Sequence, residues 1–337
     1  WLPNRWGQDW GSLVEVKGLD VNRALAAHTA EWVVRQGEEF YRSLGFDSLP
    51  GTFWEKSSLY PVPADSPYRK NTHASAWHLD TDRDVRSLMS VEPNREWYET
   101  VHHELGHIYY FMTYSTPEVP LVLRQGANRA YHEGVGSMIG LASLQRRFLV
   151  GRKLLPADAK VDGIPHLLQE ALSYVVFVPF AAGTMTRFEH ALYAEHLPAD
   201  KLNETWWDLT RKYQGIVPPS LRDERWADAL TKTHINDDPA QYYDYALSYA
   251  LIFQLHDHIA RKILKQDPHD TDYHGSREVG DFLKRLMAPG GTRPWREALR
   301  ESTGSELDAK AMVEYFQPLY VWLQEQNRGR KATLPDL

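Results

Sequence analysis

Apolar residues recur at helical spacing along most of the chain, and one stretch departs from that pattern. Positions 21–46 carry apolar residues every three or four places, and proline or glycine breaks separate further segments of this kind. Residues 68–90 mix charged, polar and apolar positions without a stripe, which predicts a short β-hairpin or ribbon. We therefore expect a mostly α-helical fold in which this hairpin is the only notable sheet. Further helices are expected at about 95–114, 128–150, 165–193 with a kink near Pro179, 203–213, 239–265, 276–287 and 305–327.

Composition is that of a globular protein. The 337 residues are 42% apolar and include 12 tryptophans, which is enough for a large core. No internal linker separates the helical segments, so we expect one body. The net charge of −7 gives no reason to expect nucleic-acid binding, and we find no run of about 18 apolar residues that would predict a membrane span. Cysteine is absent, which excludes disulfide bonds.

Candidate chemistry lies within the expected helix at 95–114. His103 and His107 are four residues apart, so on a helix both imidazoles lie on one face, one turn apart. Two nitrogens can then reach one metal ion at about 2.0–2.1 Å. Glu104 lies beside them, where a carboxylate can take a proton from a water that zinc activates. This five-residue pattern alone is weak, because a helix can carry two histidines and a surface glutamate without binding any metal.

A third ligand is expected from the next helix. Catalytic zinc sites use three protein ligands and keep one position open. Asn128 is a suitable N-cap, and Pro117 and Pro120 allow the chain to return antiparallel. Glu133 lies 26 residues after His107 (133 − 107) among apolar neighbours, where a carboxylate needs a partner. The alternative is a surface glutamate that binds nothing.

Several blocks of sequence along the chain form a recognisable series. They are Val-His-His-Glu-Leu-Gly-His-Ile-Tyr-Tyr (101–110), Leu-Arg-Gln-Gly-Ala-Asn (123–128), Tyr-His-Glu-Gly-Val-Gly (131–136), His-Ala-Ser-Ala-Trp (73–77), Arg-Lys-Tyr-Gln-Gly-Ile-Val-Pro-Pro (211–219), Arg-Pro-Trp (293–295) and Tyr-Phe-Gln-Pro-Leu-Tyr-Val-Trp-Leu-Gln-Glu-Gln-Asn (315–327). Together they resemble the angiotensin-converting enzyme family of zinc peptidyl dipeptidases, over nearly the whole chain. The resemblance implies a large helical body with a deep cleft. It also implies one zinc ion held by His103, His107 and Glu133.

The resemblance assigns roles to polar residues outside the zinc motif. His234 and Tyr245 match a histidine and a tyrosine that donate hydrogen bonds to the developing oxyanion, which can contribute about 3–4 kcal/mol. Lys232 and Tyr242 match the pair that binds the free C-terminal carboxylate of the substrate. Without the resemblance, a lone tyrosine on such a helix would be interpreted as core or surface filler.

Further substrate contacts are implied in the same way. His73 and Ala74 match the segment that holds the substrate backbone by strand-like hydrogen bonds. Phe177, Phe180 and Tyr249 would line the pocket for the last substrate side chain. The alternative for these three aromatic residues is plain core packing.

Three positions depart from the family's pattern. Ser137 stands where relatives carry an acidic residue that orients a zinc-bound histidine, and a serine brings no charge to that place. Asp244 stands where an arginine binds activating chloride. Thr210, with Arg211 beside it, stands at a second chloride-binding arginine. We therefore expect that chloride does not activate the protein.

The chain resembles only the C-terminal part of the family's proteins. We interpret residues 1–337 as the single C-terminal catalytic portion of a peptidyl dipeptidase. The N-terminal lid portion is absent from this chain, and we expect the chain to pack against that portion of the same protein. The absence of cysteine fits a bacterial-type member. The resemblance implies a secreted or periplasmic location, although this chain contains no targeting segment.

The function implied by the resemblance is release of C-terminal dipeptides from oligopeptides by zinc-dependent hydrolysis. Two alternatives stay open. A carboxypeptidase branch of the family removes a single residue, although Ala74 is a proline there and Lys232 is not retained. The other alternative is a catalytically inactive zinc-containing binding protein. Ser137 and the missing N-terminal part leave it open, and the intact His103, Glu104, His107 and Glu133 oppose it.

Overall fold

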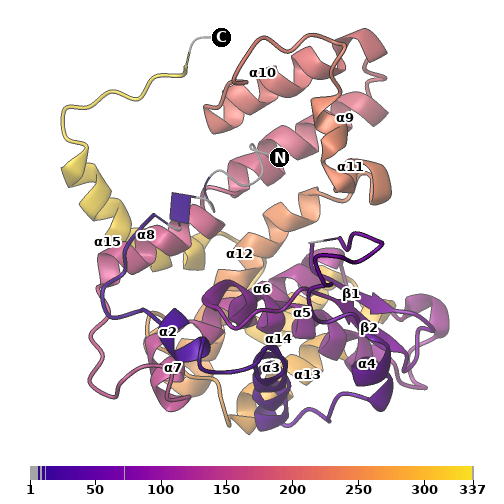
Figure 1. The fold of residues 1–337 in the computed structure, drawn as a ribbon, viewed down its shortest axis with the longest axis vertical. Coiled ribbons are helices and arrows are strands. Elements are labelled where there is room, and N and C mark those ends of the chain that lie inside the picture. Colours follow the sequence, from indigo (N-terminus) through magenta and orange to yellow (C-terminus); the bar gives the residue numbers. More distant parts are fainter. Residues whose placement is uncertain (1–6, 8–9, 12, 72, 336–337) are drawn as a thin grey trace. The chain divides into compact units, whose positions relative to one another are not determined.

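A computed structural model describes residues 7, 10–11, 13–71 and 73–335 (Figure 1). This part of the chain is mostly helical and contains one two-stranded sheet, which confirms the expected fold class. The helices are α2 (Asn22–Leu25), α3 (Ala30–Leu44), α4 (Gly51–Lys56), α5 (Arg95–Tyr114), α6 (Arg129–Ser143), α7 (Arg146–Gly151), α8 (Gly163–Tyr174), α9 (Thr186–Tyr193), α10 (Leu202–Gln214), α11 (Thr233–Asp237), α12 (Tyr243–Asp257), α13 (Arg277–Met287), α14 (Trp295–Thr303) and α15 (Lys310–Gln326). Two π-helical segments cover Pro179–Met185 and His258–Leu264.

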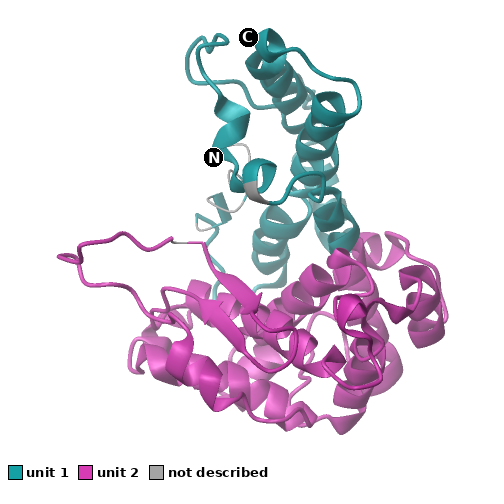
Figure 2. Ribbon diagram, turned by 90° about the vertical axis from the view of Figure 1, so that its right-hand side faces the viewer, with its two compact units in different colours: residues 1–17, 162–249, 316–337 teal, residues 18–161, 250–315 magenta. Residues whose placement is uncertain are grey.

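The chain divides into two compact units (Figure 2). Unit 1 comprises residues 1–17, 162–249 and 316–337, and unit 2 comprises residues 18–161 and 250–315. The sequence analysis expects a single body because it finds no linker. Two of the boundaries fall inside α12 and α15, where the helical pattern continues without a break. Local sequence patterning therefore carries no signal of this division.

Helical spacing located most helices to within a few residues and missed several breaks. The helix expected at 21–46 is interrupted before α3, where the Thr29 side chain accepts a hydrogen bond from Trp32 N at 3.1 Å. The helix expected at 128–150 is divided into α6 and α7, and the kink near Pro179 is a π-helical segment. Helices α4, α11 and α14 were not expected. Short helices depend on tertiary packing, so they show too little periodicity to be found in the sequence.

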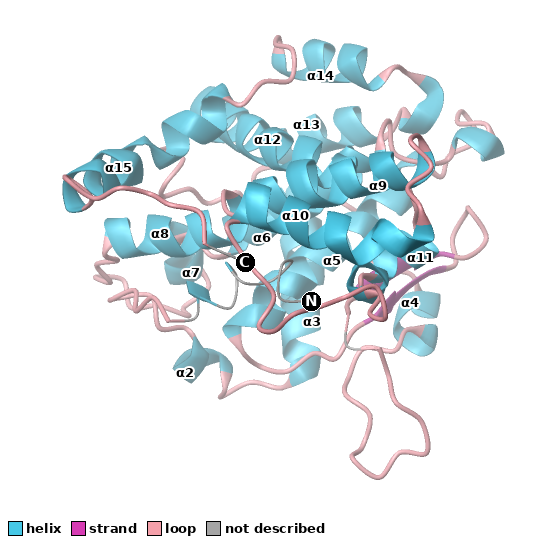
Figure 3. Ribbon diagram, turned by 90° about the horizontal axis from the view of Figure 1, so that it is seen from above, coloured by secondary structure: helices cyan, strands magenta, loops and turns pink. Residues whose placement is uncertain are grey.

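The expected hairpin consists of β1 (Ser75–His78) and β2 (Val85–Leu88), which pair antiparallel (Figure 3). The register places Ser75 opposite Leu88 and His78 opposite Val85. An isolated parallel bridge joins Leu88 to Ser58 on the far side of β2. Within the described residues, β1 therefore keeps one edge without a strand partner.

Two glycines set the close packing of α5 against α6 in unit 2. A Cβ atom on Gly106 would lie 2.7 Å from the Cα of Gly136, and a Cβ atom on Gly136 would lie 2.9 Å from the carbonyl oxygen of His103. Real Cβ atoms do not tolerate contacts this short, so only glycine allows the two backbones to approach so closely. This approach brings Glu133 on α6 beside His103 and His107 on α5.

Replacing Gly136 with alanine is therefore expected to push α6 away from α5. Overpacking of this kind costs about 1–3 kcal/mol in the free energy of unfolding, and the shift of Glu133 should weaken metal binding as well. Denaturant unfolding and a zinc-binding titration measure the two effects. Gly163→Ala is the matched control, because a Cβ atom at that helical position meets nothing within 4 Å. Equal behaviour of the two variants would contradict the role of Gly136.

One continuous helical run, Gly163–Tyr193, is long and apolar enough to cross a membrane by length and composition alone. The sequence analysis expects a helix at 165–193 but no membrane span, because polar residues such as Gln169 and Glu170 interrupt the run of apolar residues. Half of its most apolar window is buried inside the protein. Phe180, Met185 and Phe188 within it are almost fully enclosed. These features are typical of a core helix, and the absence of a membrane span stays a prediction.

Candidate metal centre and associated clusters

His103, His107 and Glu133 form a compact cluster in unit 2. The Nε2 atoms of His103 and His107 lie 3.1 Å apart. The Glu133 carboxylate oxygens lie 3.8 Å from His103 Nε2 and 4.0 Å from His107 Nε2. One ligand atom from each residue lies within 4.8 Å of the others, and the described residues contain no second group of this kind. The fold therefore brings the predicted ligand set together.

Side-chain caps position the two helices that carry these ligands. Asn94 Oδ1 accepts a hydrogen bond from Trp97 N at 2.9 Å at the start of α5. Asn128 Oδ1 accepts one from Ala130 N at 2.8 Å at the start of α6, as the sequence predicted. Each cap satisfies a backbone N–H that the first helical turn would leave unpaired.

The chemistry of the donor set fits a zinc ion. Burial lowers the pKa of His103 and that of His107 to about 4, so both imidazoles are neutral near pH 7, which is the form that binds metal. Two ligands bonded to tetrahedral zinc lie about 3.3 Å apart, close to the 3.1 Å between the two Nε2 atoms. Ser137 Oγ lies 3.1 Å from His103 Nδ1. A ring N–H donated to that oxygen leaves His103 Nε2 free for the metal.

Glu104 is buried beside the cluster, with 5% of the residue exposed. Its Oε2 atom has no hydrogen-bond partner among the described residues. Burial, and to a smaller extent the negative charge of Glu133, raises the pKa of this carboxyl group to about 8. A buried carboxylate without a partner is costly, and a nearby cation would offset that cost. A carboxyl group that titrates near neutral pH is also suited to accept and return a proton.

His73 and Ala74 lie in unit 2, directly before the first residue of β1. His73 lies close enough to the cluster for its charge to contribute to the lowered pKa of His103. The two residues thus lie at the start of the strand whose outer edge has no strand partner in the described part of the chain. Their proposed contact with a substrate backbone stays a prediction.

Four other predicted residues come together in unit 1. Two lie on α11 and α12, and the other two lie directly before these helices. His234 Nε2 lies 3.2 Å from Tyr245 Oη. The ring centre of Tyr242 lies 5.1 Å from that of His234 and 4.7 Å from that of Tyr245. The ammonium group of Lys232 lies 5.1 Å from the centre of the Tyr242 ring. Residues separated by up to 13 positions (245 − 232) therefore form one polar aromatic cluster.

Three aromatic residues border this cluster in unit 1. The ring of Phe177 lies 5.6 Å from Phe180, 5.1 Å from Tyr249 and 6.2 Å from Tyr245, measured between ring centres. All three predicted pocket residues are buried. Rings packed in this way can line a pocket or fill a core, so the proposed role of Phe177, Phe180 and Tyr249 stays a prediction.

The sequence analysis missed Glu189, a buried residue on α9 in the same unit. Its Oε1 accepts a hydrogen bond from Ala240 N at 2.8 Å, and its carboxylate also accepts one from the Tyr242 backbone. Ala240 has φ +60°, in the left-handed region that disfavours residues with a Cβ atom. Glu189 therefore supports the strained turn that leads to Tyr242. A lone glutamate in an amphipathic helix gives no sequence signal of such a role.

Known proteins are similar to this chain over almost its full length. The chain matches the family described as angiotensin-converting enzyme over residues 1–334. Angiotensin-converting enzyme of Mesocricetus auratus is 35% identical over 349 residues, which covers 99% of this chain and 26% of that protein. The angiotensin-converting enzyme-related protein of Drosophila melanogaster is 33% identical over 346 residues, which covers 97% of this chain and 54% of that protein.

The chain thus spans between about a quarter and about half of the length of these relatives. The family match extends over nearly all of its 337 residues. The cluster of two histidines and a glutamate is the kind of site that a zinc peptidase of this family requires. The chain belongs to the angiotensin-converting enzyme family of metallopeptidases.

Proposed function

We propose that the protein to which this chain belongs is a zinc peptidyl dipeptidase that releases C-terminal dipeptides from oligopeptides. The observation that carries the proposal is the cluster of His103, His107 and Glu133 with the buried Glu104 beside it. Family membership supports peptide hydrolysis in general. Release of two residues rests on Lys232 and Ala74, at which the single-residue carboxypeptidases of the family differ.

Each residue of the cluster has a separate role in the proposed hydrolysis. His103, His107 and Glu133 would hold the zinc ion, which when bound polarises the scissile carbonyl and acidifies a water molecule. Glu104 accepts a proton from the attacking water and returns it to the leaving amine, a role that its pKa of about 8 supports. His234 and Tyr245 are proposed as the hydrogen-bond donors to the oxyanion.

Substrate binding is proposed for the remaining predicted residues. Lys232, which is 8% exposed, and Tyr242 would bind the substrate carboxylate by charge and hydrogen bonding. His73 and Ala74 would hold the backbone. Phe177, Phe180 and Tyr249 would contact the last side chain. We also propose that an N-terminal portion of the same protein packs against this chain and contributes to the cleft.

A peptide ladder tests the proposal. The full-length protein is loaded with zinc and incubated with an oligopeptide, and the products are identified by mass spectrometry over time. Successive losses of two C-terminal residues would support the proposal. Successive losses of one residue would replace it with a carboxypeptidase, and bound zinc without any cleavage would replace it with a binding protein.

Activity is expected to be independent of chloride. Asp244, next to Tyr245, is 2% exposed, and Thr210 is buried with its hydroxyl donated to Trp206 O at 2.8 Å. Arg211 donates its Nε to Pro335 O at 2.7 Å. A carboxylate repels an anion 4–5 Å away by about 3–4 kcal/mol at an effective dielectric constant near 20.

The measurement is kcat/KM on a short peptide as sodium chloride replaces sodium acetate at constant ionic strength. A flat response is expected. A several-fold, saturable rise with chloride would show that an anion site exists despite Asp244 and Thr210.

A further inference from the structure

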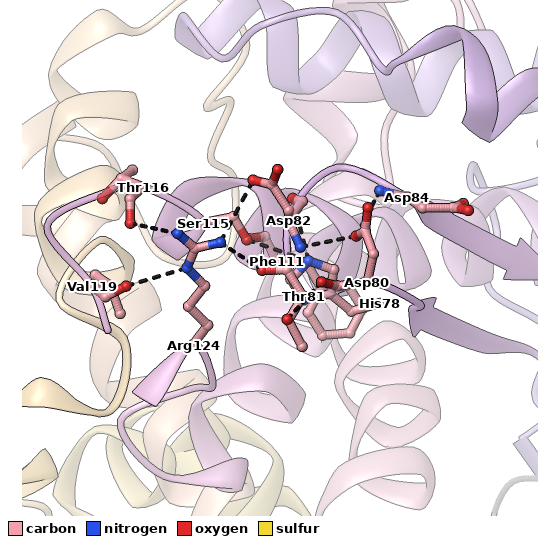
Figure 4. A network of polar contacts seen from close by, with 10 residues as sticks. All are labelled: His78, Asp80, Thr81, Asp82, Asp84, Phe111, Ser115, Thr116, Val119 and Arg124. Atoms are coloured by element: carbon pink, nitrogen blue, oxygen red, sulfur yellow. Dashed lines mark hydrogen bonds and ion pairs between the residues drawn. The ribbon is translucent and has the colours of Figure 1, made fainter. Parts of the chain in front are cut away.

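Arg124 connects the turn of the hairpin to the loop that follows α5 (Figure 4). Its Nη1 donates to Thr81 O at 2.9 Å in the turn. Its Nη2 donates to Thr116 O at 3.1 Å, and its Nε donates to Val119 O at 3.2 Å. Asp82 Oδ1 in the turn lies 3.6 Å from Nη1. The guanidinium group of this side chain, which is 15% exposed, thus binds both segments.

His78 makes a second link between the same two parts of unit 2. Its ring stacks on Phe111 of α5, with ring centres 5.1 Å apart and an angle of 17° between the planes. Its Nε2 lies 3.3 Å from Asp82 O and 3.3 Å from Ser115 Oγ. The last residue of β1 is therefore attached to the C-terminal end of the helix that carries His103 and His107.

The turn itself is strained and internally braced. Thr81 has φ +57°, a left-handed conformation that is unfavourable for a β-branched residue. Asp80 Oδ1 accepts hydrogen bonds from Asp82 N and Asp84 N, each at 2.9 Å. Strain of this kind persists where the surroundings hold it, and Arg124 holds the carbonyl oxygen of the strained residue.

We propose that Arg124 is a positioning residue that sets the place of β1 relative to the zinc cluster. Arg124 lies in the connection between α5 and α6, the two helices that carry the three metal ligands. It also donates a hydrogen bond to the turn that follows β1. His73 and Ala74 lie at the other end of that short strand. A substrate backbone held along β1 would then be aligned with the metal through Arg124. This inference rests on the proposed function, because it assumes that β1 binds substrate.

The geometry of the guanidinium group explains why arginine suits position 124. A guanidinium group presents its N–H donors in a rigid fork, so it can bind three carbonyl oxygens in different directions. A lysine at this position would keep the positive charge but would lose the fixed directions. The positive charge of a lysine near Asp82 would therefore not replace the three hydrogen bonds that Arg124 donates.

Hydrogen exchange of the full-length, zinc-loaded protein tests the inference without any substrate. In Arg124→Met we expect the amides of residues 75–88 to exchange about tenfold faster, while residues 95–110 and 129–143 exchange as in the parent and zinc stays bound. In Arg124→Lys, the exchange rate of residues 75–88 should lie between that of Arg124→Met and that of the parent. Arg152→Met is the matched control, since Arg152 is a partly buried arginine of the same unit that contacts Glu39 and His274.

Kinetics supply the second readout. Loss of backbone binding raises KM more than it lowers kcat, so Arg124→Met should raise KM about tenfold and leave kcat within about twofold. Unchanged exchange in residues 75–88 would overturn the inference. So would equal acceleration across α5 and α6 with loss of zinc, because Arg124 would then only stabilise the unit. A parent protein that cleaves no peptide would refute the proposed function, whereas the exchange result would still decide whether Arg124 holds β1.

Discussion

Replacing Glu104 with glutamine is expected to lower peptide turnover by about 10²–10⁴-fold while zinc stays bound. Glutamine has nearly the same shape but cannot accept a proton from the attacking water. The ligands His103, His107 and Glu133 are untouched by the change. Because the pKa of Glu104 is about 8, its carboxyl group is mostly neutral near pH 7 in the metal-free protein, so a neutral amide should fit the same buried place.

Steady-state kinetics and zinc analysis of the full-length protein measure this effect. Glu96→Gln is the matched control, because Glu96 lies exposed in the first turn of the same helix. The control should keep the parent's rate and zinc content. A Glu104→Gln rate within about tenfold of the parent would remove Glu104 from its role as general base.

The same variant should also alter the pH dependence of stability in the metal-free protein. Glu104 binds its proton more tightly in the folded state, with a pKa of about 8, than in the unfolded state, where about 4.3 is normal. The folded protein therefore loses stability as the pH rises from about 4 to about 8. Glutamine removes this loss, so Glu104→Gln should unfold at a higher temperature than the parent at pH 8, with a smaller difference at pH 5.

Replacing His107 with alanine is expected to abolish zinc binding and, with it, hydrolysis. The variant keeps only His103 and Glu133, whereas catalytic zinc sites use three protein ligands. A ligand that binds only the folded state raises the unfolding temperature, and a tighter ligand raises it more at the same concentration. Added zinc should therefore raise the unfolding temperature of the parent and leave that of the variant unchanged.

Elemental analysis after gel filtration measures the zinc content. A thermal melt with and without added zinc measures the change in unfolding temperature. His190→Ala is the control, because His190 is an exposed histidine on α9 that pairs with Glu195. Zinc retained at the parent's level in His107→Ala would show that the ligand assignment is wrong.

The sequence by itself determined the elements that hold the metal cluster. Helical spacing and the surrounding proline breaks placed a helix at about 95–114, and α5 covers Arg95–Tyr114. Asn128 marked the start of α6, because its side chain can cap the helix locally. The spacing of His103 and His107 placed both on one face. These features depend on residues within a few positions of each other, so local patterns are enough to predict them.

Only the tertiary structure decided how these elements meet. The contact of Gly106 with Gly136, the raised pKa of Glu104 and the hydrogen bond of Arg124 to Thr81 all depend on segments that are distant in sequence. The division into two units has the same origin, because two of its boundaries fall inside α12 and α15. Periodicity reports which face of a helix is buried, but not which backbone lies against it or how much water is excluded. Close approach and desolvation are properties of the packed fold, and they set both the geometry of the metal cluster and the charge state of the residue beside it.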